Sequence, residues 1–194
     1  MSNRTYLDAE ELLQLAIHAS QKDDHETAII NLKRALEISP ENAKLHYFLG
    51  AEHAQIGLFD RAMREMTHAI QLDSSLVAAI FQLGLIHLTS GQVEQAIECW
   101  LPLNELGESN YLYLFKTGMI HLSRDEFDEC ESHLKKGIDL NQENKPLNQD
   151  MQRILADIEN RRKEGLVPST DTTQATAENN HFFLSAYADS NQQH

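Results

Sequence analysis

The sequence is poor in cysteine and in positive charge. Its 194 residues include only two cysteines, Cys99 and Cys130, too few for the disulfide framework of a small secreted domain. We therefore expect a reducing compartment. Sixteen Lys and Arg stand against 30 Asp and Glu, giving a formal net charge of −14. This negative field repels phosphate backbones and anionic lipids, so nucleic acid is not an expected partner.

Long apolar runs and known catalytic motifs are also missing. No stretch approaches the roughly 20 apolar residues that cross a bilayer, and Met1 to Glu10 lacks the basic start and apolar run of a signal peptide. We expect a cytoplasmic protein without membrane contact. The motifs GxGxxG, GxxxxGKS/T, HExxH and GxSxG are absent from the chain. We therefore expect no enzymatic activity and no cofactor.

The sequence does contain a repeat with a period of 34 residues. Gly50, Gly84 and Gly118 follow this period, and Ala16 takes the same position in the first unit. A second small position lies twelve residues further on. Small residues let two helices cross at the short end of the usual range of about 8–10 Å, so each unit is predicted to be a helical hairpin. The second small position holds Ala28, Ala62, Ala96 and Cys130.

Large apolar residues flank the two small positions and are predicted to form the core. Because Gly84 occupies the first small position, Gly84→Leu is predicted to destabilise the fold through overpacking. Asp8 with Glu11 has the pattern of a capping box at the start of the first helix, and Gly57 and Gly91 mark turns inside hairpins. The predicted core residues are Leu15, Leu49 and Leu83 on first helices, and Leu32, Met66, Trp100 and Leu134 on second helices.

These positions resemble the tetratricopeptide repeat (TPR) family, whose sequence of a bulky residue, Leu-Gly, an aromatic, Ala, an aromatic and Pro is matched in order. The resemblance implies an all-α fold, a right-handed α-solenoid of four TPR hairpins. Some positions depart from the family: Ser74, Glu108 and Gln142 replace its Pro, and Thr117, Glu131 and Gly137 make the fourth unit the weakest match. The four units are residues 9–42, 43–76, 77–110 and 111–144.

Three further segments follow the repeats. Residues 146–164 are predicted to form a capping helix that begins at Pro146, ends before Gly165 and covers the last repeat. Residues 165–180 read as a flexible polar linker. Residues 181–194 regain apolar character and are predicted to be a ligand for a groove, through Phe182, Phe183, Leu184 and Tyr187.

Several residues invite a chemical role, but packing is the preferred interpretation. His53, His87 and His121 share one position of successive units, too widely spaced for one metal ion, because zinc ligands lie within about 2.1 Å of it. We expect their rings to pack between helices and to form local hydrogen bonds, and Trp100 to lie in the core. Pro102 predicts a kink or an early end of its helix near Leu101.

The resemblance also implies a binding groove, because the first helix of each repeat lines the concave face in this family. The groove is mostly apolar and lacks the Lys and Asn clamp with which some members hold acidic chaperone tails: Leu13, Ile17, Tyr47 and Ala51 stand at those positions. The residues predicted to line it are Leu13, Ile17, Tyr47, Phe48, Ala51, Phe81, Gln82, Leu85, Leu88, Phe115, Lys116, Met119 and Leu122.

The sequence therefore predicts a non-catalytic adaptor or chaperone-like protein that binds a polypeptide with apolar or aromatic anchors. Its own C-terminal segment is an alternative occupant of the groove, either in the same chain or in a second copy. A holder of exported proteins, similar to bacterial secretion chaperones, and a self-assembling structural subunit remain alternatives. The oligomeric state, monomer or homo-oligomer, stays open.

Overall fold

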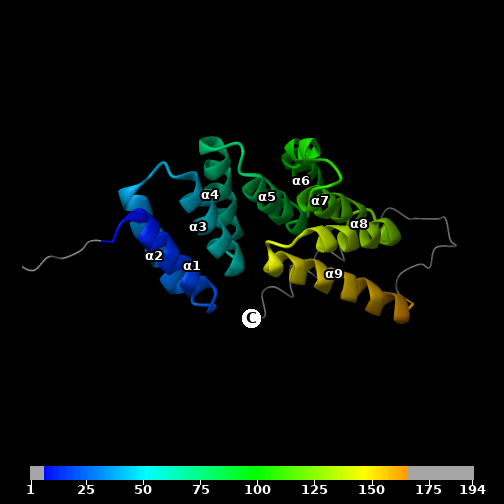
Figure 1. Cartoon of the computed structure of the whole chain (residues 1–194). Coiled ribbons are helices and arrows are strands. Elements are labelled where there is room, and N and C mark those ends of the chain that lie inside the picture. The colour runs from blue at the N-terminus through cyan, green and yellow to red at the C-terminus, as the bar shows by residue number, and fades with distance from the viewer. Residues whose placement is uncertain (1–6, 166–194) are drawn as a thin grey trace, which may run out of the picture. The chain divides into compact units, whose positions relative to one another are not determined.

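The computed structural model describes residues 7–165, and these residues form helices and no strand, which confirms the all-α class (Figure 1). Helices follow one another with short connections of a few residues. The elements are α1 (Ala9–Ser20), α2 (His25–Ile38), α3 (Ala43–Gln55), α4 (Phe59–Leu72), α5 (Val77–Thr89), α6 (Val93–Cys99), the 3₁₀ helix η1 (Leu101–Leu106), α7 (Tyr111–Leu122), α8 (Phe127–Leu140) and α9 (Lys145–Lys163). The C-terminal segment 181–194 lies outside the described residues.

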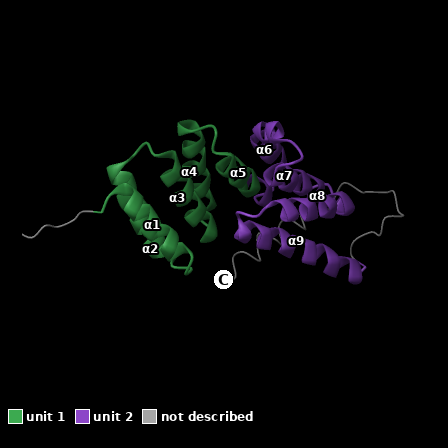
Figure 2. Cartoon of the chain, viewed as in Figure 1, with its two compact units in different colours: residues 1–86, 191–194 green, residues 87–190 purple. Residues whose placement is uncertain are grey.

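The chain divides into two compact units, and the division falls inside α5, between Ile86 and His87 (Figure 2). Unit 1 contains the hairpins α1–α2 and α3–α4, with α2 packed against α3. Unit 2 contains the hairpin α7–α8, with η1 against α7 and α9 against α8.

The core of unit 1 is built from small and branched residues of its first three helices. Leu12, Leu13, Leu32 and Leu45 are at most 1 % exposed, and Ala16, Ala28 and Ala35 bring the helices close together. The prediction that Leu15 belongs to this core is wrong, because its side chain is 44 % exposed. Within the described residues α1 is the first helix, and it packs against α2.

The helices of a hairpin cross at the two small positions, as the repeat predicts. A Cβ atom on Gly50 would lie 2.8 Å from Met66 Cγ and 3.2 Å from the Ala62 carbonyl oxygen. The equivalent atom on Gly118 would lie 2.7 Å from Leu134 Cδ2 and 3.3 Å from the Cys130 carbonyl oxygen. The same contact therefore recurs in repeats two and four: each glycine faces the large residue and the small-residue carbonyl of its partner helix.

The 34-residue period also appears in the backbone conformation of the turns. Gly57 and Gly91 have φ angles of 74° and 76°, and Asp23 and Asp125 have φ angles of 59° and 57°. These four residues are spaced by the repeat of 34, so the left-handed conformation recurs in the turns after α1, α3, α5 and α7. Glycine adopts it without strain, whereas aspartate is one of the few other residues that tolerates it.

The second helix of the third repeat is interrupted, as Pro102 predicts. α6 ends at Cys99, and the chain continues as the 3₁₀ helix η1 with Pro102 at its start. Proline lacks the amide hydrogen for the α-helical ladder and clashes with the preceding turn. Trp100, at the junction, is fully buried, in agreement with its assignment to the core.

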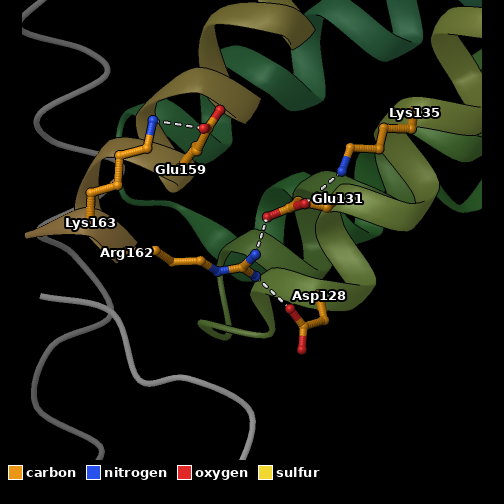
Figure 3. A network of polar contacts seen from close by, with 6 residues as sticks. All are labelled: Asp128, Glu131, Lys135, Glu159, Arg162 and Lys163. Atoms are coloured by element: carbon orange, nitrogen blue, oxygen red, sulfur yellow. Dashed lines mark hydrogen bonds and ion pairs between the residues drawn. The ribbon is translucent and has the colours of Figure 1, made fainter. Parts of the chain in front are cut away.

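Helix α9 is held to α8 by apolar burial and by one arginine. Leu147, Met151, Ile154 and Ile158 are buried along one side of α9. On its polar side, Arg162 reaches α8 and forms ion pairs with Asp128, at 2.5 Å, and Glu131, at 2.7 Å (Figure 3). After Lys163 the helix closes at Gly165, which has a φ of 70°.

The three residues that depart from the family pattern in the fourth repeat make specific contacts. Glu131 is paired with Arg162 of α9 and with Lys135, and the Thr117 hydroxyl donates to the Tyr113 carbonyl oxygen at 2.7 Å. The Phe115 ring occupies the place that a Cβ on residue 137 would need, so only glycine fits there. These departures therefore adapt the last hairpin to α9 and to a large ring inside it.

Candidate functional site

The residues predicted to line a groove lie on the first helices α1, α3, α5 and α7, but many of them are covered. Their exposure therefore decides which can meet a partner. Half-buried positions are Ile17, Tyr47, Phe48, Ala51 and Gln82. Buried positions, with side chains at most 9 % exposed, are Leu13, Phe81, Leu85, Leu88, Phe115, Lys116, Met119 and Leu122.

In unit 2, the predicted groove residues act as packing residues. Phe115 is fully buried; its ring lies over Gly137 of α8 and meets the Tyr111 ring edge-on at 5.8 Å between centroids. Lys116 is 6 % exposed, and its Nζ donates to Asn104 Oδ1 of η1 at 2.5 Å. Burial lowers the pKa of Lys116. Both side chains therefore bind α7 to its neighbours and present little surface to a ligand.

In unit 1, four of the predicted groove residues are apolar and half-buried: Ile17 of α1 and Tyr47, Phe48 and Ala51 of α3. We call this set the apolar face. The Tyr47 and Phe48 rings lie 5.3 Å apart between centroids, and Ala51 is one helical turn further along. Ile17 and Phe48 also pack on the buried core of the unit. Two of the four side chains are thus anchored on the core, and all four are half-buried.

A small pocket opens between α1, α2 and α3 at the apolar face. Its volume is about 90 Å³, equivalent to about three water molecules at about 30 Å³ each. We call it the α1–α3 pocket. Its lining residues are Ala16, Ile17, Ser20, Gln21, Leu32, Phe48 and Glu52.

Glu52 is the one acidic residue in the lining of this pocket, and sequence reasoning missed it. Its side chain is 6 % exposed, and Oε2 lies 2.8 Å from Nδ1 of His25, at the start of α2. Because a carboxylate only accepts hydrogen bonds, Nδ1 of His25 carries the proton. The available signal was an acidic residue among the apolar residues of α3, one helical turn after Phe48. Ser20 and Gln21 occupy groove positions of the first repeat and were also left out.

The three repeat-equivalent histidines differ in one informative way. His87 Nδ1 bonds Gln92 Oε1 at 2.6 Å, and His121 Nδ1 bonds Glu126 Oε2 at 2.5 Å. The residue five positions after His53 is Leu58, which has no acceptor. His53 Nδ1 is accordingly buried without a hydrogen-bond partner, and burial lowers the pKa of His53. The expectation of local hydrogen bonds holds for two of the three rings.

Replacing Leu58 by glutamine is expected to stabilise unit 1. The new amide oxygen can take the position that Gln92 holds beside His87, and satisfying a buried donor contributes about 1 kcal/mol. Leu58 is 39 % exposed, so little apolar burial is lost. Urea unfolding should show a higher midpoint for Leu58→Gln than for the wild type. Leu72→Gln is the control, because Leu72 is 36 % exposed and the residue five positions before it is not a histidine. Equal shifts in both variants would contradict this explanation.

The cysteines and histidines of the described part of the chain do not form a metal-binding cluster. Residues 7–165 contain no group of three or more His, Cys, Asp or Glu side chains placed to hold a metal ion. Cys130 is fully buried, which raises its pKa to about 12. Such a thiol is inert at neutral pH, because the thiolate is the reactive form.

Comparison with known proteins identifies the repeat and the fold. The tetratricopeptide repeat family matches residues 12–42, which span most of the α1–α2 hairpin. The crystal structure of MamA is similar, with a TM-score of 0.56 and 23 % identity over 68 % of this chain and 77 % of that chain. No curated protein sequence matches the chain. Within the described residues, no helix is both long and apolar enough to span a membrane.

Proposed function

We propose that the chain, which matches the tetratricopeptide repeat family over residues 12–42 and is similar in fold to MamA, is a non-catalytic module whose unit 1 binds a polypeptide through the apolar face. Tetratricopeptide hairpins are protein-interaction scaffolds, and helical repeats offer extended surfaces for this purpose. The partner is a polypeptide segment with apolar or aromatic anchors. An adaptor or a chaperone-like role follows from this binding.

The observation that carries the proposal is the partial exposure of Ile17, Tyr47, Phe48 and Ala51, of which Ile17 and Phe48 pack on the core of unit 1. Aromatic and aliphatic side chains that are half-covered by their own core lose little conformational entropy when a partner covers the rest. An adjacent pocket supplies a recess for one side chain of the partner. Interfaces concentrate their binding energy at such positions, where an anchor fills a recess surrounded by apolar surface.

The C-terminal segment 181–194 remains a second candidate occupant, in the same chain or in a neighbouring copy. It contains Phe182, Phe183, Leu184 and Tyr187, which have the chemistry expected of a ligand for the apolar face. The preceding linker of residues 165–180, at 3.3–3.6 Å per residue, reaches up to roughly 53–58 Å when extended. Tethering brings the local concentration to about millimolar, enough to occupy a weak site.

Tyr47→Ala is expected to weaken partner binding by about 30-fold while leaving the helices intact. Truncating an aromatic anchor at an interface typically costs about 2 kcal/mol of binding free energy. The measurement uses the main polypeptide that co-purifies with the tagged wild-type chain, produced pure and titrated by calorimetry. Ile30→Ala on α2, where the side chain is 51 % exposed, is the control for loss of an exposed apolar group. Unchanged affinity in Tyr47→Ala, or an equal loss in Ile30→Ala, would reject the apolar face as the binding site.

A further inference from the structure

We propose that the α1–α3 pocket is a recognition site for a lysine side chain of the bound polypeptide. This inference rests on the proposed function and names the chemistry of one anchor that the partner carries. It adds a polar, charge-selective element to a surface that the sequence alone describes as apolar.

The walls of the pocket suit the methylene stem of a long side chain. Ala16, Ile17, Leu32 and Phe48 contribute apolar surface, and Glu52 stands among them. A recess of about 90 Å³ is large enough for one slender aliphatic chain with a compact head. Lysine has this shape: its four methylenes cover apolar surface while the ammonium group seeks a charged partner.

The hydrogen bonding of Glu52 determines which cation fits. His25 already occupies Oε2, whereas Oε1 has no hydrogen-bond partner within the described residues. An arginine fork requires both oxygens for its bidentate geometry. A single available oxygen therefore favours the ammonium of lysine, which binds as a point charge.

The charge and the burial of Glu52 favour a cation over a neutral group. An ammonium group has three hydrogens to donate; Glu52 Oε1 can accept one of them, and the others can stay in contact with water at the pocket mouth. Much of the desolvation of Glu52 is already present in the unbound protein, because its side chain is 6 % exposed. The formal net charge of −14 also attracts a cationic segment over longer distances.

The test titrates n-butylammonium, which reproduces the lysine side chain, into the full-length protein and follows the Ile17 methyl signal by NMR. We expect saturable shifts with a dissociation constant on the order of millimolar, as is usual for a fragment of a few atoms. n-Propylguanidinium and n-butanol should each bind at least tenfold more weakly. Equal binding of butanol would show a purely apolar recess and overturn the assignment, and so would the absence of saturable butylammonium shifts.

Two variants and one matched control locate the binding. Glu52→Gln keeps the shape and the His25 contact but removes the charge, and Ser20→Leu fills the pocket without touching Glu52; each should reduce butylammonium affinity at least tenfold. Glu65→Gln removes the carboxylate of the other His–Glu pair in unit 1, His46–Glu65 at 2.7 Å, which lies outside the pocket lining. Its affinity should equal that of the wild type.

Retained binding in both Glu52→Gln and Ser20→Leu, or an equal loss in Glu65→Gln, would overturn the lysine site. That failure leaves the effect of Tyr47→Ala on polypeptide binding untouched. Conversely, an unchanged polypeptide affinity in Tyr47→Ala would reject the proposed function without altering the amine titration. The two failures are therefore distinguishable.

Discussion

Phe115→Ala is expected to lower the free energy of unfolding by about 3–5 kcal/mol, the usual cost of deleting a buried phenylalanine ring. The ring is fully buried and lies where a side chain on residue 137 would otherwise be. Gly137 cannot fill the resulting space because it has no side chain. The loss therefore includes a cavity as well as the transfer of the ring. Urea unfolding followed by circular dichroism measures the effect.

This variant separates two roles for Phe115, a groove anchor and a core residue. Tyr113→Ala, two residues earlier on α7 at a half-buried side chain, is the control and should cost less than half as much. If Phe115→Ala unfolds at the same midpoint as the wild type and binds the polypeptide more weakly, the sequence-based assignment of Phe115 to a groove is restored. A large loss of stability identifies it as core.

Gly118→Leu is expected to destabilise unit 2 by about 1–3 kcal/mol or more through overpacking. Leucine has a higher helix propensity than glycine, by about 0.8 kcal/mol, which opposes the effect. The clash prevails because the first added atom already lies 2.7 Å from Leu134 Cδ2 and 3.3 Å from a backbone oxygen of α8. Leu134 is fully buried and has no free space to move into, so the two helices must separate.

The control for Gly118→Leu introduces the same side chain at an exposed position of a neighbouring helix, Ala156→Leu in α9. Its unfolding midpoint should stay within the error of the wild-type value. Gly50→Leu repeats the experiment in unit 1, against Met66. If Gly118→Leu and Gly50→Leu both match the control, the helices do not cross at the small positions and the repeat register is wrong.

The repeat could be predicted from sequence because its physical requirement falls on single residues. A close helix crossing admits only small side chains, and Gly50 and Gly118 meet the opposite helix as that requirement predicts. The turn residues Asp23 and Asp125 were missed because aspartate does not signal a positive φ as glycine does. Their spacing from Gly57 and Gly91 was the available signal.

The groove was less predictable because a repeat position specifies on which side of its helix a residue lies, and not how deeply its side chain is buried. Tyr47 and Phe115 occupy the same position of their repeats, yet Tyr47 is half-buried and Phe115 is fully buried. The difference arises in part from Gly137, whose missing side chain admits the Phe115 ring. The α1–α3 pocket could not be predicted, because its lining comes from three helices and its glutamate contacts His25. A periodic sequence pattern encodes neither feature.

Site-specific photo-crosslinking tests the central claim most directly, namely that a polypeptide binds at the apolar face of unit 1. A photoreactive phenylalanine analogue replaces Tyr47 in one protein and Thr67, an exposed residue of α4, in another. After irradiation with the purified partner, mass spectrometry identifies the linked peptides. Crosslinks from position 47 and none from position 67 are predicted; a link to residues 181–194 would name the chain's own segment as the occupant. Crosslinks from position 67 alone would contradict the account.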